Sequence, residues 1–169
     1  MAAGRDAGPV GTPLRLPVRN GRAWSFTDGL RAADVLPLRF GALPPAEAAA
    51  RLFADLDTGL AARIDRGDVL VAGQALGIGE GGAAAARALH AAHVGAVVAA
   101  SFAGAFDDAL LALGVPALVV DAPAIFHTGQ RLRINLEAGT IANLSSGDRQ
   151  PIRYLTEAVL ELLRSRLEP

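Results

Sequence analysis

Gly77, Gly79 and Gly82 form a G-x-G-x-x-G pattern between an apolar run typical of a buried strand and an Ala-rich run typical of a helix. A dinucleotide site needs the strand to lead directly into the first glycine and an acidic residue about 20 positions later. Here residues 73–76 separate the strand from the pattern, and Ser101 stands where the acidic residue is required. A dinucleotide site is therefore disfavoured. Two interpretations are left. Either the glycines only permit a positive φ and close packing of the helix on the strand, or they place backbone N–H groups around a small anion.

The same loop carries a single ionisable side chain, Glu80. A partly desolvated carboxylate has a raised pKa and can act as a general base, so Glu80 is the candidate catalytic residue. A solvated carboxylate near a helix start instead stabilises that helix and performs no chemistry. The candidate ligand-binding residues of the loop are the glycines whose N–H groups surround it, namely Gly77, Gly79, Gly81 and Gly82.

Two histidines, His90 and His93, stand three residues apart on the Ala-rich run. Two histidines on one helix face could bind a metal, but neither an acidic residue nor a third histidine is close in sequence. We therefore expect two histidines on a helix surface and no metal site in this chain. Asp107 and Asp108 open a predicted helix, where acidic side chains suit the helix dipole. Trp24, the only tryptophan, is expected in the core or at an interface.

The composition predicts a single globular domain in the cytoplasm. The chain has 169 residues, of which 51% are hydrophobic and 20% are charged, and its formal net charge is −1. This balance gives no sign of binding to nucleic acid or to a membrane surface, and no window approaches the ~18 apolar residues of a membrane span. The absence of cysteine excludes disulfides, thiolate nucleophiles and metal clusters held by thiolates of this chain. Residues 1–20 are rich in Gly, Ala and Pro and are expected to be flexible, whereas residues 21–169 form the domain.

Hydrophobic periodicity predicts the elements that position the glycine loop. A β-α-β-α-β pattern over residues 67–120 favours a parallel sheet with right-handed crossovers. Two short alternating runs within 131–144 indicate a β hairpin. Helical spacing of apolar residues predicts one helix over 46–64 and an amphipathic C-terminal helix over 152–168.

Further short motifs occur in a regular order along the chain. They are the run at 21–40, Gly73 with Gly77 and Gly79, Ser101-Phe102-Ala103 with Phe106, the turn from Gly114 to Pro116, and Gly139 with Ile141 and Asn143. Together these motifs resemble the small subunit of 3-isopropylmalate dehydratase, which is the swivel domain of the aconitase family. The resemblance covers about residues 21–145. It implies an α/β fold of the aconitase swivel type, a β/β/α domain with a mixed or parallel sheet.

The resemblance also implies a partner and a class of ligand. Members of that family dock on a large subunit that carries a [4Fe–4S] cluster, and the two chains together dehydrate and rehydrate a hydroxy-di- or tricarboxylate. A cluster-bearing large subunit, a small carboxylate ligand and no cofactor in this chain are therefore expected. The lack of cysteine agrees with the last point, since the thiolates that hold the cluster would belong to the partner.

The chain departs from the family pattern at the residues that carry chemistry. The family's glycine loop continues Ser-Ser-Arg-Glu, with serine as the base and arginine as the clamp for a substrate carboxylate, whereas residues 80–83 are Glu-Gly-Gly-Ala. Glycine cannot supply the bidentate contact of a guanidinium. The family's first loop is Gly-Asp-Asn-Ile-Asp-Thr-Asp, and of residues 27–33 only Asp28 matches it. Asp28, and Arg39 in a downstream Pro-x-Arg match, are further candidate ligand-binding residues, and Arg31 could assist Arg39.

Three functions are open on these grounds. The first is a diverged small subunit of an aconitase-type hydro-lyase that acts on a small carboxylic acid. The second is a metal-free enzyme on the same fold that uses Glu80 for proton transfer. The third is a non-catalytic binding or scaffold subunit. The resemblance favours the first, and a second copy of this chain is a further candidate partner.

Overall fold

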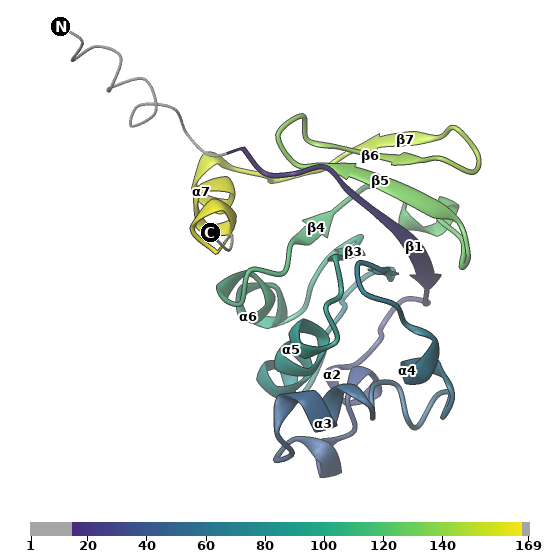
Figure 1. Ribbon diagram of the computed structural model, residues 1–169, viewed down its shortest axis with the longest axis vertical. Helices are drawn as coiled ribbons and strands as arrows, with labels where there is room; N and C mark the ends of the chain where they lie inside the picture. The colour runs from purple at the N-terminus through teal and green to yellow at the C-terminus, as the bar shows by residue number, and fades with distance from the viewer. Residues whose placement is uncertain (1–14, 167–169) are drawn as a thin grey trace, which may run out of the picture.

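One mixed sheet organises the chain. The structure, a computed structural model, describes residues 15–166, and over that range the sheet has seven strands in the order β4-β3-β2-β1-β5-β6-β7 (Figure 1). The strands are β1 Arg19–Ser25, β2 Val69–Val71, β3 Ala96–Ala99, β4 Ala117–Val119, β5 Arg131–Asn135, β6 Thr140–Asn143 and β7 Arg149–Pro151. Strands β1 to β4 pair in parallel, whereas β5 pairs antiparallel with both β1 and β6, and β6 with β7.

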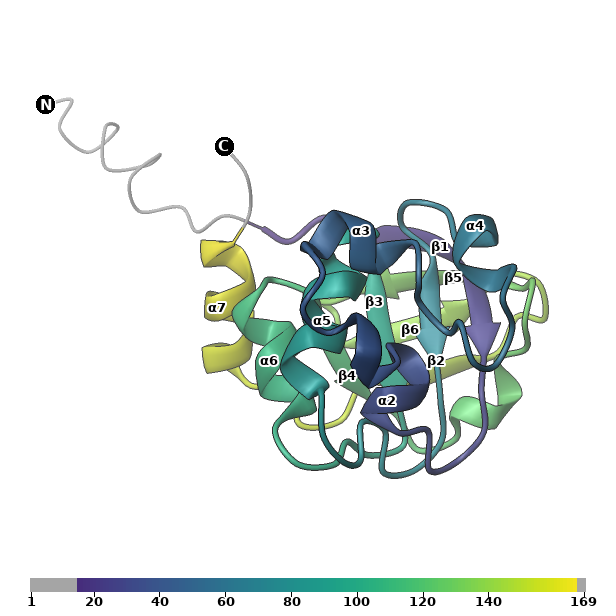
Figure 2. The ribbon, with the colours of Figure 1, turned by 90° about the horizontal axis from the view of Figure 1, so that it is seen from below.

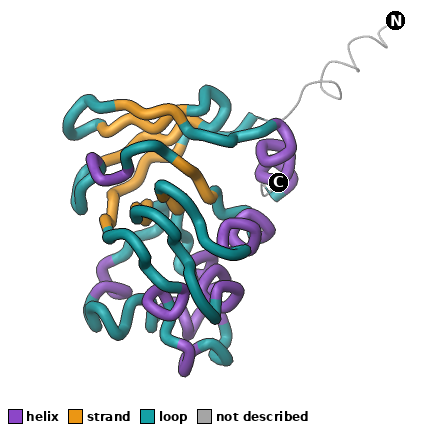
Figure 3. The backbone as a smooth tube through the Cα atoms, turned by 180° about the vertical axis from the view of Figure 1, so that it is seen from behind, coloured by secondary structure: helices purple, strands orange, loops and turns teal. Residues whose placement is uncertain are grey.

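Short helices fill the connections between the strands. They are α2 Ala32–Val35, η1 Leu38–Phe40, α3 Pro45–Ala49, α4 Leu60–Arg63, α5 Gly82–Ala91, α6 Phe106–Ala112, η2 Pro123–Ile125 and α7 Glu157–Ser165. Figure 2 shows α2, α3, α5 and α6 on one side of β2, β3 and β4. Seen from behind, the strands gather in one half of the molecule and most helices in the other (Figure 3).

The parallel strands are apolar on both faces because each face is covered. Leu70 and Val97 belong to the core cluster that includes the buried residues of α5 and α6. Their neighbours Val69 and Val98 belong to a second cluster, with Ile134 and other residues of the antiparallel strands. The result is three layers. The helices form the first layer, the part of the sheet with β2 to β4 forms the second, and the part with β5 to β7 forms the third (Figure 1). This arrangement is the predicted β/β/α domain.

The predicted α/β class and its main units are confirmed. Helix α5 joins β2 to β3, helix α6 joins β3 to β4, and both strand pairs are parallel. The hairpin of β5 and β6 is also present, with Ile134 opposite Ile141. The sheet is mixed because β5, β6 and β7 extend the parallel part beyond β1.

The predicted helix over 46–64 is wrong. Helix α3 ends at Ala49, turns follow, and α4 spans only Leu60–Arg63. The chain leaves the helical path at Phe53, which adopts a left-handed φ of 59° and donates its N–H to Val35 O at 2.7 Å. Phe53 is fully buried and stacks on Phe26 with ring centroids 4.6 Å apart. Burial of its large ring compensates for a backbone conformation that aromatic residues rarely adopt.

Both ends of the described chain differ from the predicted boundaries. Helix α7 begins only at Glu157, with the Thr156 hydroxyl accepting from Val159 N at 3.3 Å, so 152–156 are not helical. Residues 167 and 168 of the predicted helix, and residues 1–14 of the predicted flexible segment, lie outside the described range. Strand β1 starts at Arg19, inside the predicted flexible segment. Over residues 15–166, no helix combines the length and apolar character needed to cross a bilayer.

Candidate functional site

Three loops meet at the carboxyl ends of the parallel strands. We name them the first loop (27–31), the glycine loop (73–82) and the third loop (100–105). The first and glycine loops lie side by side, since Gly77 N donates to Leu30 O at 2.8 Å. The glycine and third loops also lie side by side, since Leu76 N donates to Ser101 O at 3.0 Å. The carboxyl ends of parallel strands are the usual ligand-binding edge of such a sheet.

Two side chains fix the start of the glycine loop. Asp28 Oδ1 accepts a hydrogen bond from Gln74 N at 2.7 Å, and Ser101 Oγ accepts one from Ala75 N at 2.8 Å. Ala75 adopts a left-handed φ of 59°, so the loop turns sharply at this point. A Cβ on Gly73 would lie 1.7 Å from Asp28 Oδ1, and only glycine leaves room for that carboxylate. Asp28 is therefore part of the loop's framework as well as a candidate ligand-binding residue.

A hollow of about 450 Å³, the strand-end hollow, opens between these loops and the segment after β4. It is lined by residues 25–28, 71–74, Ala100 and 121–124. Its charged side chains are Asp28 and Asp121. Arg153 donates two hydrogen bonds to Asp121 Oδ2, at 2.6 and 3.1 Å, and this contact lowers the pKa of Asp121. The hollow thus offers polar groups and negative charge, and the lining given by the described residues contributes no cation.

A second hollow, of about 290 Å³, lies over the glycine loop and the start of α6. We name it the glycine hollow; its lining is Gly77, Gly79, Gly82, Ala83, Gly104, Ala105, Phe106 and Ala109. All of these side chains are uncharged. Gly77, Gly79 and Gly81 adopt left-handed φ values of 95°, 87° and 92°, which bring the chain into the N-terminus of α5 without a side-chain cap. The α5 N–H groups at this end have no side-chain acceptor, and they are the donors that the glycine hollow can offer to a ligand oxygen.

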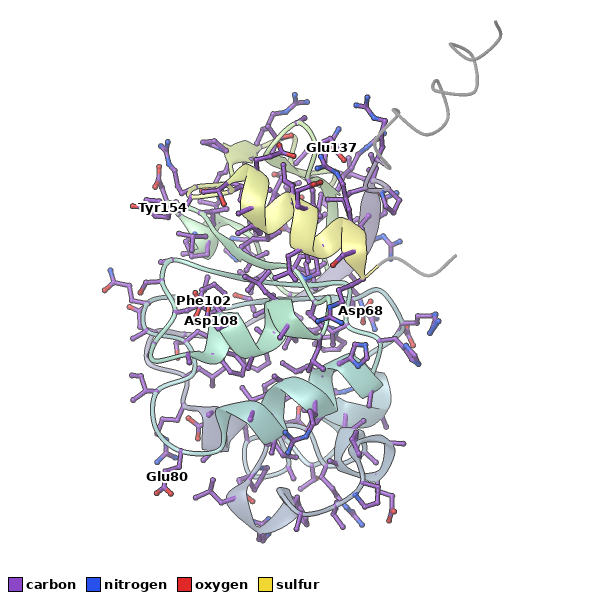
Figure 4. All side chains as sticks on the ribbon, turned by 90° about the vertical axis from the view of Figure 1, so that its left-hand side faces the viewer. Asp68, Glu80, Phe102, Asp108, Glu137 and Tyr154 are labelled. Atoms are coloured by element: carbon purple, nitrogen blue, oxygen red, sulfur yellow. The ribbon has the colours of Figure 1, made fainter. Side chains whose placement is uncertain are left out.

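Glu80 projects from the rim of the glycine loop into solvent (Figure 4). It does not cap α5, whose N-cap residue is Gly81. Its carboxylate is therefore accessible to a molecule that approaches the loop from outside. The structure leaves its catalytic role as a prediction.

The two arginines predicted near the first loop have carboxylate partners within the chain. Arg39 makes a bidentate contact with Asp55, with Nη1–Oδ2 and Nη2–Oδ1 distances of 2.9 and 2.6 Å. The guanidinium of Arg39 lowers the pKa of the Asp55 carboxyl. Arg31 Nη2 lies 2.8 Å from Asp34 Oδ1. Both arginines are exposed, and a ligand carboxylate would have to compete with these partners, so the ligand-binding role of Arg39 stays a prediction.

Topology brings only part of the predicted set together. Asp28 and the glycines share the edge formed by the three loops, whereas Arg39 lies on η1 outside both hollows. Sequence reasoning missed Asp121 and the role of Phe106 in lining the glycine hollow. Asp121 follows a predicted strand directly, which places it at the same carboxyl edge, so its position is the signal that could have found it. His90 lies in the last turn of α5, whereas His93 follows the helix with a left-handed φ of 61°, so the expectation of two histidines on one helix surface is wrong for His93. The described residues hold no group of three or more potential metal ligands.

Comparison with known proteins identifies the family. None of the searched protein-family models matches the chain. A 3-isopropylmalate dehydratase small subunit of Thermotoga maritima is 30% identical over 146 residues, which span 85% of this chain and 88% of the relative. A small subunit of the same enzyme from Methanopyrus kandleri is 32% identical over 152 residues, which span 88% of this chain and 88% of the relative. This chain belongs to the family of 3-isopropylmalate dehydratase small subunits. The main prediction, that this chain is a small subunit of the aconitase-type hydro-lyase family, is therefore confirmed at the level of the family.

A solved structure shows the same fold for a dehydratase of this kind. The crystal structure of 3-isopropylmalate dehydratase from Methanocaldococcus jannaschii superimposes with a TM-score of 0.81 at 24% identity. The match covers 87% of this chain and 88% of that one. The swivel-type fold predicted from the motifs is therefore confirmed.

Proposed function

We propose that this chain is the small subunit of a two-chain hydro-lyase that acts on a small hydroxy acid, with a cluster-bearing large subunit as its partner. The observation that carries the proposal is identity of 30% or more to two curated small subunits over at least 85% of the chain. The second support is the meeting of the first, glycine and third loops at one edge of the sheet.

The charges at this edge favour a site completed by another chain. The strand-end hollow contains the carboxylates of Asp28 and Asp121, and the glycine hollow is lined by uncharged residues. The nearby Arg31 and Arg39 already bind Asp34 and Asp55. A carboxylate ligand needs positive charge or strong donors to offset its desolvation. The partner subunit supplies that charge in this proposal, and this chain supplies shape and backbone N–H groups.

The proposed [4Fe–4S] cluster belongs to the partner. This chain contains no cysteine, and its described residues include no group of three or more potential ligands. Its residues therefore do not fit the cluster as ligands. The contribution of this chain lies in what its own loops present to the substrate.

Glu80 is the proposed proton acceptor, because it is the ionisable side chain of the glycine loop and is accessible. In dehydration its carboxylate would take the proton from the carbon next to the substrate carboxyl group. The electron pair of that C–H bond would become the second bond of the new C=C double bond, and the C–O bond of the neighbouring carbon would break with its electron pair on the leaving hydroxide. That hydroxide and the proton taken up by Glu80 together make up the one molecule of water that is released. Hydration runs the same steps in reverse. The N–H groups at the start of α5 would donate to a substrate oxygen.

The test is co-expression with a large subunit that holds three cluster cysteines, followed by size-exclusion chromatography and an assay of 3-isopropylmalate and related hydroxy acids. We expect a stable complex, with turnover that needs both chains. Glu80→Gln should lower kcat by about 100-fold or more, as loss of a general base does. Glu47→Gln, on the exposed side of α3, is the matched control and should leave kcat unchanged.

Three results would correct the proposal. Turnover by this chain alone would show a stand-alone enzyme. A stable complex without turnover of any hydroxy acid would show a scaffold subunit. Full activity of Glu80→Gln in an active complex would remove Glu80 from the mechanism and leave the subunit role intact.

A further inference from the structure

A third hollow lies at the opposite edge of the sheet, where β2, β3 and β4 begin. Its volume is about 320 Å³. Arg19, Arg66, His90, His93 and Arg166 contribute to its lining, and no acidic side chain of residues 15–166 does. We name it the cationic hollow. Figure 4 shows Asp68, next to Gly67 of this lining, on the opposite side of the view from Glu80, so this hollow is separate from the loops of the candidate site.

Close backbone packing fixes the shape of the cationic hollow. Gly67 N donates to His93 O at 2.8 Å, which ties the turn before β2 to the end of α5. A Cβ on Gly21 or on Gly95 would lie 2.1 or 2.5 Å from Gly67 O, so only glycines allow this approach. The turn that carries Arg66 is therefore held firmly beside His93. The hollow is built by the fold and does not depend on the rotamer of one exposed side chain.

Arg19 is the most informative group in this hollow. Its Nη1 donates to Gly95 O at 3.0 Å, but its Nε is buried and has no hydrogen-bond partner among the described residues. Desolvation by burial lowers the pKa of Arg19. Removing a guanidinium from water without a counter-ion is unfavourable, so a site of this kind favours an anion.

The other arginines of the hollow also lack a carboxylate partner in the described range. Over residues 15–166, the ion pairs use six arginines, and none of them is Arg19, Arg66 or Arg166. Three guanidinium groups thus approach one hollow from β1, from the turn before β2 and from the residue after α7. This concentration of charge occurs in a chain whose formal net charge is −1.

We propose that the cationic hollow binds a phosphate group, either free or as part of a small phosphorylated molecule. A tetrahedral dianion has several acceptor oxygens and can accept from guanidinium groups that arrive from different directions, whereas a single carboxylate is planar and carries one charge. The volume of about 320 Å³ is sufficient for a phosphate with a small attached group. The inference does not depend on the proposed hydro-lyase function, because the two sites lie at opposite edges of the sheet.

The test uses the full chain and inorganic phosphate, titrated by calorimetry and by ³¹P NMR line width at ionic strength held constant with chloride. We expect saturable binding at one site. Arg66→Gln should weaken it about tenfold or more, since it removes charge-assisted hydrogen bonds. Arg133→Gln, on the exposed face of β5, removes the same charge elsewhere and should leave the affinity unchanged. Arg166→Gln is a second variant, and should weaken binding as Arg66→Gln does.

Two outcomes would overturn the proposal. If phosphate binding does not saturate, phosphate reaches the hollow as an adventitious ion only. The cations would then stabilise the C-terminal end of α5 near His90, where the helix dipole is negative. Equal affinities of the wild type and Arg66→Gln would exclude the hollow as the site. A glucose 6-phosphate titration then separates the sources: tighter binding than inorganic phosphate supports a phosphorylated molecule, and equal binding supports free phosphate.

Discussion

Gly77 lies so close to Phe106 that a Cβ on Gly77 would be 2.5 Å from Phe106 Cβ and 2.6 Å from its Cγ. Gly77 also adopts a left-handed φ of 95°, so glycine meets both a conformational and a steric requirement here. The contact seats the glycine loop on the first residue of α6. Phe106 thereby lines the glycine hollow and holds the loop against the third loop.

Gly77→Ala should destabilise the protein more than Gly79→Ala does. Both positions have positive φ, at 95° and 87°, and alanine costs about 1 kcal/mol or more in that conformation. Only Gly77 adds the clash with Phe106, since a Cβ on Gly79 meets nothing within 4 Å. Overpacking of this kind costs a further ~1–3 kcal/mol. Urea unfolding of both variants, followed by circular dichroism, measures the difference, and equal losses would contradict this account of the loop.

Asp68→Ala should be strongly destabilising. Asp68 is 3% exposed and accepts hydrogen bonds from Trp24 Nε1 at 2.8 Å, from Asp65 N at 2.8 Å and from Arg22 Nη2 at 3.3 Å. Its removal leaves the part-buried N–H groups of Trp24 and Asp65 without this acceptor and takes from Arg22 one of its two carboxylate partners, at a cost of about 2–4 kcal/mol. The prediction is checked by the free energy of unfolding in urea.

The control for this prediction is Asp65→Ala. Asp65 contacts the same Arg22 nitrogen at 3.3 Å, but its side chain is 78% exposed. Exposed ion pairs contribute about 0–1 kcal/mol. A loss in Asp65→Ala as large as that in Asp68→Ala would show that burial does not decide the effect.

The parallel part of the fold follows from sequence because its strands are covered on both faces. Val69 to Val71 and Ala96 to Ala99 are continuous apolar runs, and such runs with helical segments between them specify parallel pairing. The same reasoning fails over 46–64, since Leu52, Phe53 and Leu60 are buried at helical spacing by turns and not by a helix. Hydrophobic periodicity indicates which side of a segment is buried, but it does not determine the backbone conformation. Phe53 fits the helical spacing although its own φ is left-handed.

The features that could not be predicted from the sequence depend on contacts between residues that are far apart in the chain. Strand β7 reads Arg-Gln-Pro, and its place in the sheet depends on Gln150, whose side chain exchanges two 2.8 Å hydrogen bonds with Ala122. In the site, strand order predicts that Asp28 meets the glycine loop. The partner of Arg39 is Asp55, sixteen positions away, and no local pattern indicates that pair.

Acidification should weaken the attachment of α7. Arg164 lies 2.8 Å from Glu137 and also contacts Glu157 and Glu161. Its hydrogen bonds, with that of Leu16 N, lower the pKa of Glu137 below the ordinary value of 4.5. A carboxyl with a lowered pKa in the folded state adds stability that is complete above its unfolded pKa and is lost as the pH falls through the folded pKa. Glu137→Gln should therefore be less stable than the wild type at pH 7, with a difference that shrinks below about pH 4.

Urea unfolding of the wild type and Glu137→Gln from pH 7 to pH 3 measures that difference. Glu161→Gln is the control, since Glu161 contacts the same arginine but its side chain is 65% exposed. Its effect should be smaller at every pH. A wild-type advantage over Glu137→Gln that grows on acidification would contradict the assigned direction of the pKa shift.

Two variants of Asp28 separate its structural role from its charge. Asp28→Asn keeps an Oδ1 acceptor for Gln74 N, now 2.7 Å from it, and removes one of the two negative charges of the strand-end hollow. Its stability should stay within about 0.5 kcal/mol of the wild type, whereas Asp28→Ala should lose about 1–2 kcal/mol because the Gln74 N–H loses its acceptor. Hydrogen exchange of the Gln74 amide should be faster in Asp28→Ala alone. In the two-chain assay, a change in KM for Asp28→Asn at unchanged stability would assign the charge to ligand binding, and identical kinetics would restrict Asp28 to holding the loop.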